Sequence, residues 1–162
     1  KRLRKLIHLK SYFDLFKKTW ITVMNELNID FDVTGFSDDM QIKAFIIDFD
    51  TIFNNLISNS IYAIKAKRST VGRNIRIEGK IEDDYLTIIV SDSGKGLDKQ
   101  YQNNPSVIFN AFESSKCNKN GEKIGTGLGL YIVKATINEY NGSSVQVLYQ
   151  SEGFAVKIMF KI

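Results

Sequence analysis

Two asparagines, Asn55 and Asn59, stand four residues apart in a segment with helical apolar spacing, residues 49–66. With Tyr62 they share one face of the predicted helix, because residues three and four apart are neighbours on a helix surface. Asparagine disfavours the middle of a helix, since its side chain competes for backbone hydrogen bonds. A neutral amide oxygen suits Mg²⁺ beside a polyphosphate because it adds no negative charge. These two residues by themselves do not exclude the alternative, a pair of solvent-facing asparagines.

A second motif, Asp92-Ser93-Gly94-Lys95-Gly96, directly follows the apolar run 86–90. A carboxylate at the end of a strand can accept a hydrogen bond from an exocyclic amine, and glycines let a backbone approach a ligand closely. The alternative is an ordinary glycine-rich turn. The motif alone does not decide between these two interpretations.

The third motif, residues 125–130, reads Gly-Thr-Gly-Leu-Gly-Leu and opens a predicted helix over 127–141. Glycines before a helix expose backbone N–H groups, and with the helix dipole these form a site for an anion such as phosphate. The alternating glycines differ from the dinucleotide-binding fingerprint, and the missing Gly-Lys-Ser/Thr ending excludes a Walker loop.

The elements that must position these motifs are read from hydrophobic periodicity and turn residues. The pattern predicts helices and paired strands in alternation, over residues 15–27 (helix), 29–34 and 41–48 (strands), 49–66 (helix), 74–82 and 85–91 (strands), 127–141 (helix), 144–150 and 155–162 (strands). This order indicates an α/β fold of the two-layer α+β type, with a mixed, mostly antiparallel sheet of about five strands. About three helices are expected to cover one face of that sheet.

The remaining segments are expected to be irregular or to lie outside the domain. Leu3, Leu6, Ile7 and Leu9 stand among basic residues, so residues 1–12 are expected to be the tail of an upstream helix or a linker. The domain proper is expected at 13–162, with Asp14 capping its first helix. A structureless stretch of about thirty residues, as between 92 and 124, is typical of a functional lid or a disordered segment.

Length and composition limit the class of protein. The 162 residues fit one domain, and 43% hydrophobic with 25% charged residues is close to the globular average. The net charge of +4 is compatible with nucleic acid, an anionic membrane or a phosphorylated ligand. A single cysteine excludes an internal disulfide and a cysteine-based zinc site. The chain begins with Lys1 and lacks an apolar stretch of roughly 20 residues, so we expect a piece of a longer protein.

The three motifs in this order resemble the GHKL ATPases, which include histidine kinases, type II topoisomerases, MutL proteins and heat-shock chaperone ATPases. Residues 55–60 are similar to the N box of that family, and residues 92–96 to its first glycine box. Residues 108–116 resemble the F box, and residues 125–130 the second glycine box. The resemblance extends from about Phe13 to Ile162. It implies the Bergerat fold, ATP and Mg²⁺ as cofactors, and an ATP lid at about 97–124.

The resemblance also implies roles for individual residues. Asn59 would coordinate the Mg²⁺ and Asp92 would receive the adenine amino group. Phe109 and Phe112 would anchor the lid. The residues implied to bind ATP are Asn55, Asn59, Tyr62, Asp92, Gly94, Gly96, Leu97, Phe112, Ser115, Lys116, Gly125, Thr126, Gly127, Leu128, Gly129 and Leu130.

The residue types favour phosphoryl transfer to a protein over hydrolysis. Hydrolysing members of the family carry a glutamate one helical turn before the metal asparagine, and Asn55 stands there in this chain. An amide cannot act as a general base at neutral pH. Asn55 and Lys116 are therefore the candidate catalytic residues of a kinase that works by positioning and charge neutralisation. Tyr62 departs from the basic residue that many kinases carry at its position.

The expected function is that of the ATP-binding catalytic domain of a sensor histidine kinase. It would donate the γ-phosphate to a histidine on an upstream dimerisation domain, with a response regulator as the further partner. His8, the only histidine, has no acidic neighbour and is expected to be a plain helix residue. We expect a cytoplasmic domain of a homodimeric parent protein, which could carry a membrane anchor, and no nucleic-acid partner. The alternatives are a GHKL-type ATPase that acts as a conformational clamp and a degenerate nucleotide-binding module.

The lid supplies a first prediction. Residues 97–124 carry few large apolar side chains, too little to offset about 1–2 kcal/mol of backbone entropy per residue. We expect residues 99–104 and 114–122 to be mobile without ligand and ordered by nucleotide. Tryptic cleavage after Lys116, Lys119 or Lys123 should therefore be slowed by an ATP analogue with Mg²⁺. Equal cleavage rates with and without the analogue would contradict a nucleotide-responsive lid.

Overall fold

The structure, a computed structural model, describes residues 3–114, 116, 120 and 125–162. Ser115, Lys119 and Lys123, which the sequence analysis assigns to the lid, lie outside the described residues. The elements are β1 (Lys5–His8), α1 (Leu9–Glu26), β2 (Asp30–Thr34), β3 (Gln41–Ala44), α2 (Ile46–Ala66), β4 (Asn74–Glu82), β5 (Tyr85–Asp92), the 3-10 helices η1 (Lys99–Tyr101) and η2 (Pro105–Phe109), α3 (Gly129–Asn138), β6 (Ser144–Leu148) and β7 (Phe154–Lys161).

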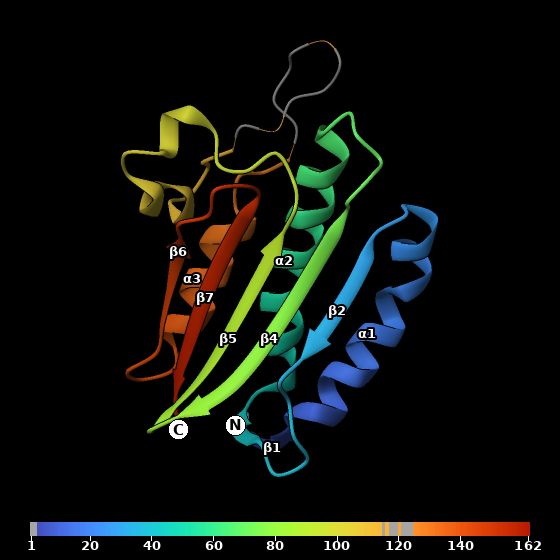
Figure 1. Ribbon diagram of the computed structural model, residues 1–162. Coiled ribbons are helices and arrows are strands. Elements are labelled where there is room, and N and C mark those ends of the chain that lie inside the picture. Colours follow the sequence, from blue (N-terminus) through green and yellow to red (C-terminus); the bar gives the residue numbers. More distant parts are fainter. Residues whose placement is uncertain (1–2, 115, 117–119, 121–124) are drawn as a thin grey trace.

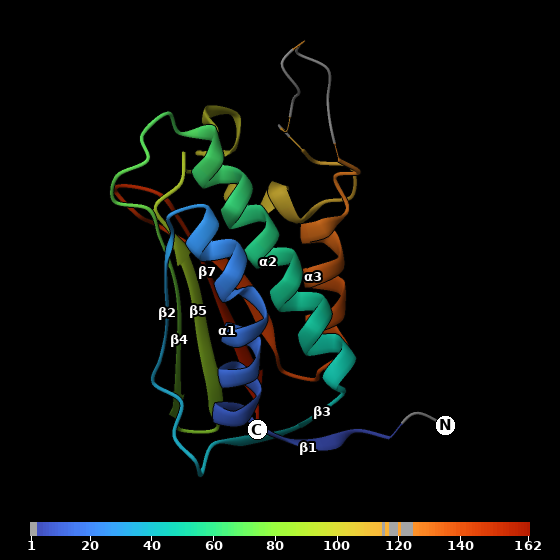
Figure 2. The same cartoon turned by 90° about the vertical axis from the view of Figure 1, so that its right-hand side faces the viewer.

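A five-stranded sheet forms one layer, in the order β2-β4-β5-β7-β6 (Figure 1). Only β2 and β4 are parallel, and the other neighbours in this sheet are antiparallel. Helices α1, α2 and α3 lie side by side on one face of the sheet (Figure 2). The predicted two-layer fold with a mixed, mostly antiparallel sheet is therefore confirmed.

Side-chain alternation explains why only one face of the sheet is covered. In β4, Ile75 and Ile77 are fully buried, whereas Arg76 between them and Glu78 after them are exposed. Successive side chains of a strand point to opposite faces, so the isoleucines meet the helices and the charged residues face solvent. The alternation thus defines a core between the sheet and the helical layer.

Helix α2 is the central helix of the covering layer. Its buried residues recur every three or four positions, which makes an apolar stripe toward the sheet: Phe49, Ile52, Phe53, Leu56, Ile57, Ser60 and Ile64. Asn55 and Asn59 lie beside this stripe and are partly exposed. The packing of the stripe therefore fixes where the two asparagines point.

An aromatic cluster joins α1 to α2 and to the turn before β3. Phe13 stacks on Phe36 with ring centroids 4.3 Å apart and meets Phe53 edge-on at 4.9 Å. The Phe36 ring fills the space above Gly79 of β4, where an added Cβ would lie 2.1 Å from it. A side chain at Gly79 would therefore expel Phe36 and loosen the cluster.

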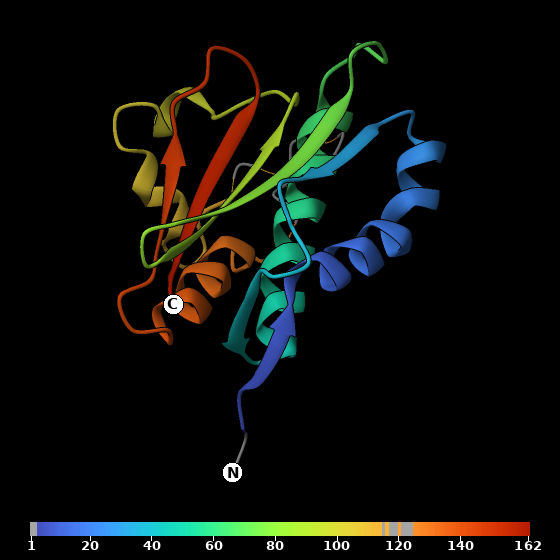
Figure 3. The ribbon, with the colours of Figure 1, turned by 60° about the horizontal axis from the view of Figure 1, so that its bottom comes forward.

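The predicted helix over residues 3–10 is wrong. Lys5–His8 form β1, which pairs antiparallel with β3 in a separate two-stranded sheet beside the start of α2 (Figure 3). Ile7 is buried and its neighbours in β1 are exposed, so the segment has strand periodicity over these four residues. Helix α1 begins at Leu9, and Asp14 lies inside it, paired with Lys10 at 2.8 Å, rather than at its start. His8 accordingly belongs to a strand.

Three further boundaries differ from the prediction. The strand expected over 41–48 ends at Ala44, and α2 begins at Ile46, because a short apolar run does not by itself distinguish strand from helix. The stretch from 92 to 124 contains η1 and η2, so it is not wholly structureless. Helix α3 ends at Asn138 instead of residue 141.

Within the described residues, no helix combines sufficient length with sufficient apolar character to cross a bilayer.

Phe13 provides a test of the core. Its side chain has no exposed surface and contacts Phe36 and Phe53, so Phe13→Ala should lower the free energy of unfolding by about 3–5 kcal/mol. Leu15→Ala on the same helix, where the side chain is 66% exposed, should change it by less than about 0.5 kcal/mol. Urea denaturation followed by circular dichroism measures both; similar losses in the two variants would contradict this packing.

Candidate functional site

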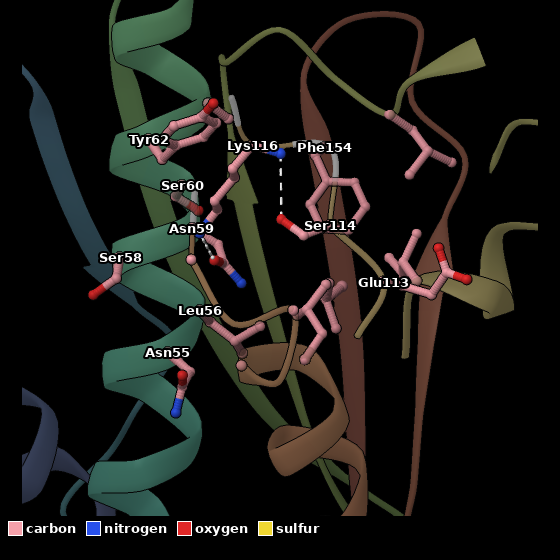
Figure 4. Close-up of a pocket in the computed structure, with 18 of the residues that line it drawn as sticks. Asn55, Leu56, Ser58, Asn59, Ser60, Tyr62, Glu113, Ser114, Lys116 and Phe154 are labelled. Carbon is pink, nitrogen blue, oxygen red and sulfur yellow. Dashed lines mark hydrogen bonds between the residues drawn. The ribbon is translucent and has the colours of Figure 1, made fainter. Parts of the chain in front are cut away.

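A cavity of about 480 Å³ lies between α2, the first turn of α3 and the ends of β5 and β7. Residues between η2 and α3 and the loop after β5 complete its rim (Figure 4). The predicted site residues that line it are Asn55, Asn59, Tyr62, Asp92, Gly96, Leu97, Lys116, Gly125, Thr126, Gly127, Gly129 and Leu130. The fold therefore brings together residues that are up to 75 positions apart in the sequence.

Asp92, the last residue of β5, forms the deep polar end of the cavity. Its side chain is 4% exposed, and its Oδ1 accepts a hydrogen bond from the backbone N–H of Gly94 at 2.8 Å. Burial raises the pKa of this carboxyl from 3.8 to about 6, although the hydrogen bonds from Gly94 and from the Ser60 hydroxyl act in the opposite direction. The fold thus holds a buried hydrogen-bond acceptor at the end of a strand.

The loop after Asp92 is pressed against the last turns of α2. The backbone N–H of Lys95 donates to the carbonyl oxygen of Ala63 at 3.0 Å. A Cβ at Gly94 would lie 2.6 Å from the Cβ of Ala63, so any larger residue would push the loop away from the helix. Gly94 consequently shapes the site through packing and does not line the cavity itself.

The two asparagines of α2 form one wall of the cavity. Asn55 donates from Nδ2 to the carbonyl oxygen of Thr51 at 2.7 Å. Its Oδ1 faces the start of α3, since a Cβ at Gly129 would lie 3.0 Å from that oxygen. Asn59 Oδ1 accepts a hydrogen bond from Lys116 Nζ at 2.7 Å (Figure 4).

The start of α3 forms the opposite wall. Leu128 is the N-cap residue and makes no side-chain hydrogen bond to the helix, so its side chain caps none of the first-turn N–H groups. The Thr126 hydroxyl accepts a hydrogen bond from the Leu128 N–H at 3.3 Å. An uncapped helix N-terminus at a cavity wall attracts anions through these N–H groups and the helix dipole.

Two lysines add positive charge to the cavity. Lys95 Nζ lies 3.2 Å from Asp98 and 5.8 Å from the centre of the Tyr62 ring. Lys116 Nζ lies 5.0 Å from the same ring. Burial, and to a smaller extent the charge of Lys95, lowers the pKa of the Lys116 ammonium. The Tyr62 ring thus lies within cation–π range of both lysines.

Three described residues of the predicted site do not line the cavity, and Ser115 lies outside the described residues. Gly94 packs against Ala63 of α2, and Leu128 is the N-cap residue of α3. Phe112 is 75% exposed, with a left-handed backbone (φ 66°) packed against Gly127. The anchoring of the F box is provided instead by Phe109, which is buried together with the preceding residue of η2.

Sequence reasoning missed much of the lining. Several apolar residues and two polar ones at the rim contribute to it: Leu56, Ala63, Val90, Ile108, Ile132, Phe154, Val156, Tyr101 and Glu113. Ser60 lies on the buried stripe of α2, yet it hydrogen-bonds Asp92. A polar residue on a buried stripe was the available signal for Ser60. Phe154 carries no such signal, because only the fold of β7 brings it to the cavity.

The donor set also fits a particular kind of metal site. Among the described residues, no group of three or more His, Cys, Asp or Glu side chains could hold a metal ion. Mg²⁺ usually takes only one or two protein ligands and completes its shell with water and phosphate oxygens. Asn59 Oδ1 already accepts a cationic group, so it fits this role. A flat polar ring at Asp92 and a metal-bound polyphosphate at α3 would together match the cavity.

Comparison with known families and proteins agrees with this geometry. The profile described as "Histidine kinase-, DNA gyrase B-, and HSP90-like ATPase" matches residues 46–162. The sensor histidine kinase FlgS of Helicobacter pylori is 31% identical over 135 residues, which cover 82% of this chain and 31% of that protein. The sensor histidine kinase YvrG of Bacillus subtilis is 27% identical over 98% of this chain and 26% of its own length. The chain therefore spans less than a third of these curated relatives.

Solved structures show the same fold. The nucleotide-free catalytic domain of histidine kinase ThkA superposes with a TM-score of 0.79 at 19% identity, covering 99% of this chain and 96% of that one. The histidine kinase AdeS of Acinetobacter baumannii gives a TM-score of 0.70 at 18% identity, over 99% of this chain and 68% of the other. At these identities the likeness concerns the fold.

Proposed function

This chain belongs to the family of histidine kinase-, DNA gyrase B-, and HSP90-like ATPases, and we propose that it is the ATP-binding catalytic domain of a sensor histidine kinase. In this proposal it binds Mg-ATP and donates the γ-phosphate to a histidine of a dimerisation domain elsewhere in the parent protein. The observation that carries the proposal is one cavity with a buried carboxyl, Asp92, at one end and the uncapped start of α3 at the other.

The two ends of the cavity suggest how the nucleotide lies. The adenine amino group would donate to Asp92, whose carboxyl is the most deeply buried acidic group of the cavity. The adenine ring would lie against apolar side chains such as Val90 and Phe154. The phosphates would then reach residues 125–129 at the start of α3, beside Asn59 and Lys116.

The wall formed by α2 supports transfer over hydrolysis. Asn55 lies one turn before Asn59 and donates a hydrogen bond to the backbone of Thr51, so it offers no base for activating water. The other carboxyl groups that line the described part of the cavity are engaged elsewhere, Asp98 with Lys95 and Glu113 with the Tyr101 hydroxyl. The chain's own residues would hold the phosphates, and Asn59 would hold a Mg²⁺ whose charge would help to neutralise them.

The phosphoacceptor is proposed to lie in another part of the parent protein. His8 belongs to β1, at the end of the domain opposite the C-terminal end of β5 (Figure 1). The relatives FlgS and YvrG are more than three times as long as the matched region, which leaves room for a dimerisation domain. A response regulator is the proposed further partner, since ThkA was solved in complex with the response regulator TrrA. We propose a cytoplasmic location for this domain.

Asp92→Asn should have opposite effects on ligand affinity and on stability. Loss of the charged acceptor should weaken ATP and ADP binding about ten- to a hundredfold, as for a lost hydrogen bond to a charged group. The raised pKa means that ionisation opposes folding, so the wild type loses stability as pH rises from about 4 through 6. At pH 7 the variant should gain up to about 3 kcal/mol in unfolding free energy, and the gain should vanish near pH 4.

Calorimetry and urea denaturation measure these two effects on the same preparations. Asp38→Asn removes the same charge from an exposed turn and controls for net charge. Unchanged nucleotide affinity in Asp92→Asn would exclude the adenine contact. A stability gain that is independent of pH would instead contradict the cause assigned to the pKa.

Asn59→Ala tests the metal site. The variant should still bind nucleotide, because the adenine end of the cavity is separate, but its affinity should no longer increase with Mg²⁺. Asn54→Ala on the same helix, whose side chain bonds the Trp20 indole away from the cavity, should respond to Mg²⁺ as wild type does. A full Mg²⁺ response in Asn59→Ala would rule that residue out as a ligand.

The same proteins separate the alternative functions. Steady-state ATP turnover by the isolated domain, abolished in Asn59→Ala, would favour the conformational-clamp ATPase. Binding of nucleic acid without any binding of nucleotide would favour the degenerate module.

A further inference from the structure

The ammonium of Lys116 occupies the oxygen that the proposed function assigns to the metal. Its Nζ donates to Asn59 Oδ1 at 2.7 Å, the length of a strong charge-assisted hydrogen bond (Figure 4). The backbone N–H of Lys116 donates to the Ser114 hydroxyl at 3.2 Å, which fixes the base of the side chain. A cation therefore already sits at this position without nucleotide or metal.

Two neutral groups hold the Lys116 ammonium: the Asn59 amide oxygen and the Tyr62 ring. The ammonium lies 5.0 Å from the centre of the Tyr62 ring, within the range of a cation–π interaction. The ion pairs of the described residues do not include Lys116, whereas Lys95 is paired with Asp98. Among the described residues, the contacts of this partly buried ammonium are therefore with neutral groups.

Lys116 and Mg²⁺ cannot both use this oxygen comfortably. An Mg²⁺ ligand lies about 2.0–2.1 Å from the ion, and the ion keeps several waters around it. Even with one lone pair of Asn59 Oδ1 each, the two positive groups would be only roughly 4 Å apart. Repulsion at that separation in a partly buried site favours one occupant at a time.

We propose that Lys116 is an internal stand-in for Mg²⁺: its ammonium occupies Asn59 Oδ1 and leaves this oxygen when the metal arrives with nucleotide. The proposal rests on the proposed function. Metal-free nucleotide leaves Lys116 at Asn59, where its charge neutralises phosphate. The ammonium would leave Asn59 Oδ1 when this oxygen binds Mg²⁺, so the position of the Lys116 side chain would follow the metal state of the nucleotide. The site thereby distinguishes metal-loaded from metal-free nucleotide.

The test is the Mg²⁺ dependence of ADP affinity, which avoids contacts to a γ-phosphate. The measured quantity is the ratio of the ADP Kd in EDTA to the ADP Kd in Mg²⁺, from calorimetry on the folded domain. In Lys116→Met, metal-free ADP should bind more weakly and Mg-ADP as tightly or more tightly. The ratio should therefore rise at least about tenfold above wild type, as for removal of one competing charged hydrogen bond. Lys116→Gln, which keeps a donor but removes the charge, should give an intermediate ratio.

Lys95→Met is the matched control. It removes the same charge from the same cavity near Tyr62, but Lys95 bonds Asp98 and not Asn59. Its ratio should stay within about threefold of wild type. Equal ratios in Lys95→Met and Lys116→Met would mean that general charge alone is responsible and would overturn the stand-in role. A ratio in Lys116→Met equal to wild type, with Asn59→Ala still insensitive to Mg²⁺, would overturn the stand-in role alone. No ADP binding by wild type would overturn the proposed function as well.

Discussion

The packing of α2 on the sheet is the constraint on which the cavity depends. A single helix presents an apolar stripe to the strands and, beside it, Asn55 and Asn59 to the start of α3. The last turns of the same helix receive the loop after β5 through the hydrogen bond from Lys95 N–H to Ala63. Both ends of the cavity are thereby attached to the same helix. A rotation of α2 would move Asn59 and the loop after Asp92 together, so the distance between them would be preserved.

The buried carboxyl of Asp92 opposes folding, and its proposed use is in ligand binding. Its burial disfavours the ionised form, and the hydrogen bonds from Gly94 and Ser60 recover only part of that cost, because the pKa remains raised. An apolar or amide side chain would fit the core with less penalty. A buried carboxyl with this cost agrees with the proposed contact to a ligand, the pattern expected where stability is exchanged for function.

Local patterns in the sequence predicted the elements that carry strong periodicity, and they failed where pairing is non-local. The strand β4 and the helix α2 could both be predicted, because the spacing of apolar residues within each segment shows which of its sides is buried. Residues 5–8 read as helix, since the partner that makes them a strand, β3, is more than thirty positions away. The polar members of the site were found through their unusual residue types. Phe154 and Ile132 were not, because an apolar residue in a cavity resembles one in the core.

The positive groups that line the described part of the cavity have neutral or partly exposed partners. The start of α3 offers uncapped N–H groups, Lys116 rests on an amide and an aromatic ring, and the bond of Lys95 to Asp98 is partly exposed. Neutral and aromatic partners keep a cation in place at small cost, yet compete weakly with a polyphosphate. Had a carboxylate stood at Asn59, it would have bound Lys116 firmly and repelled the phosphates. An amide at this position therefore leaves both the lysine and the metal exchangeable.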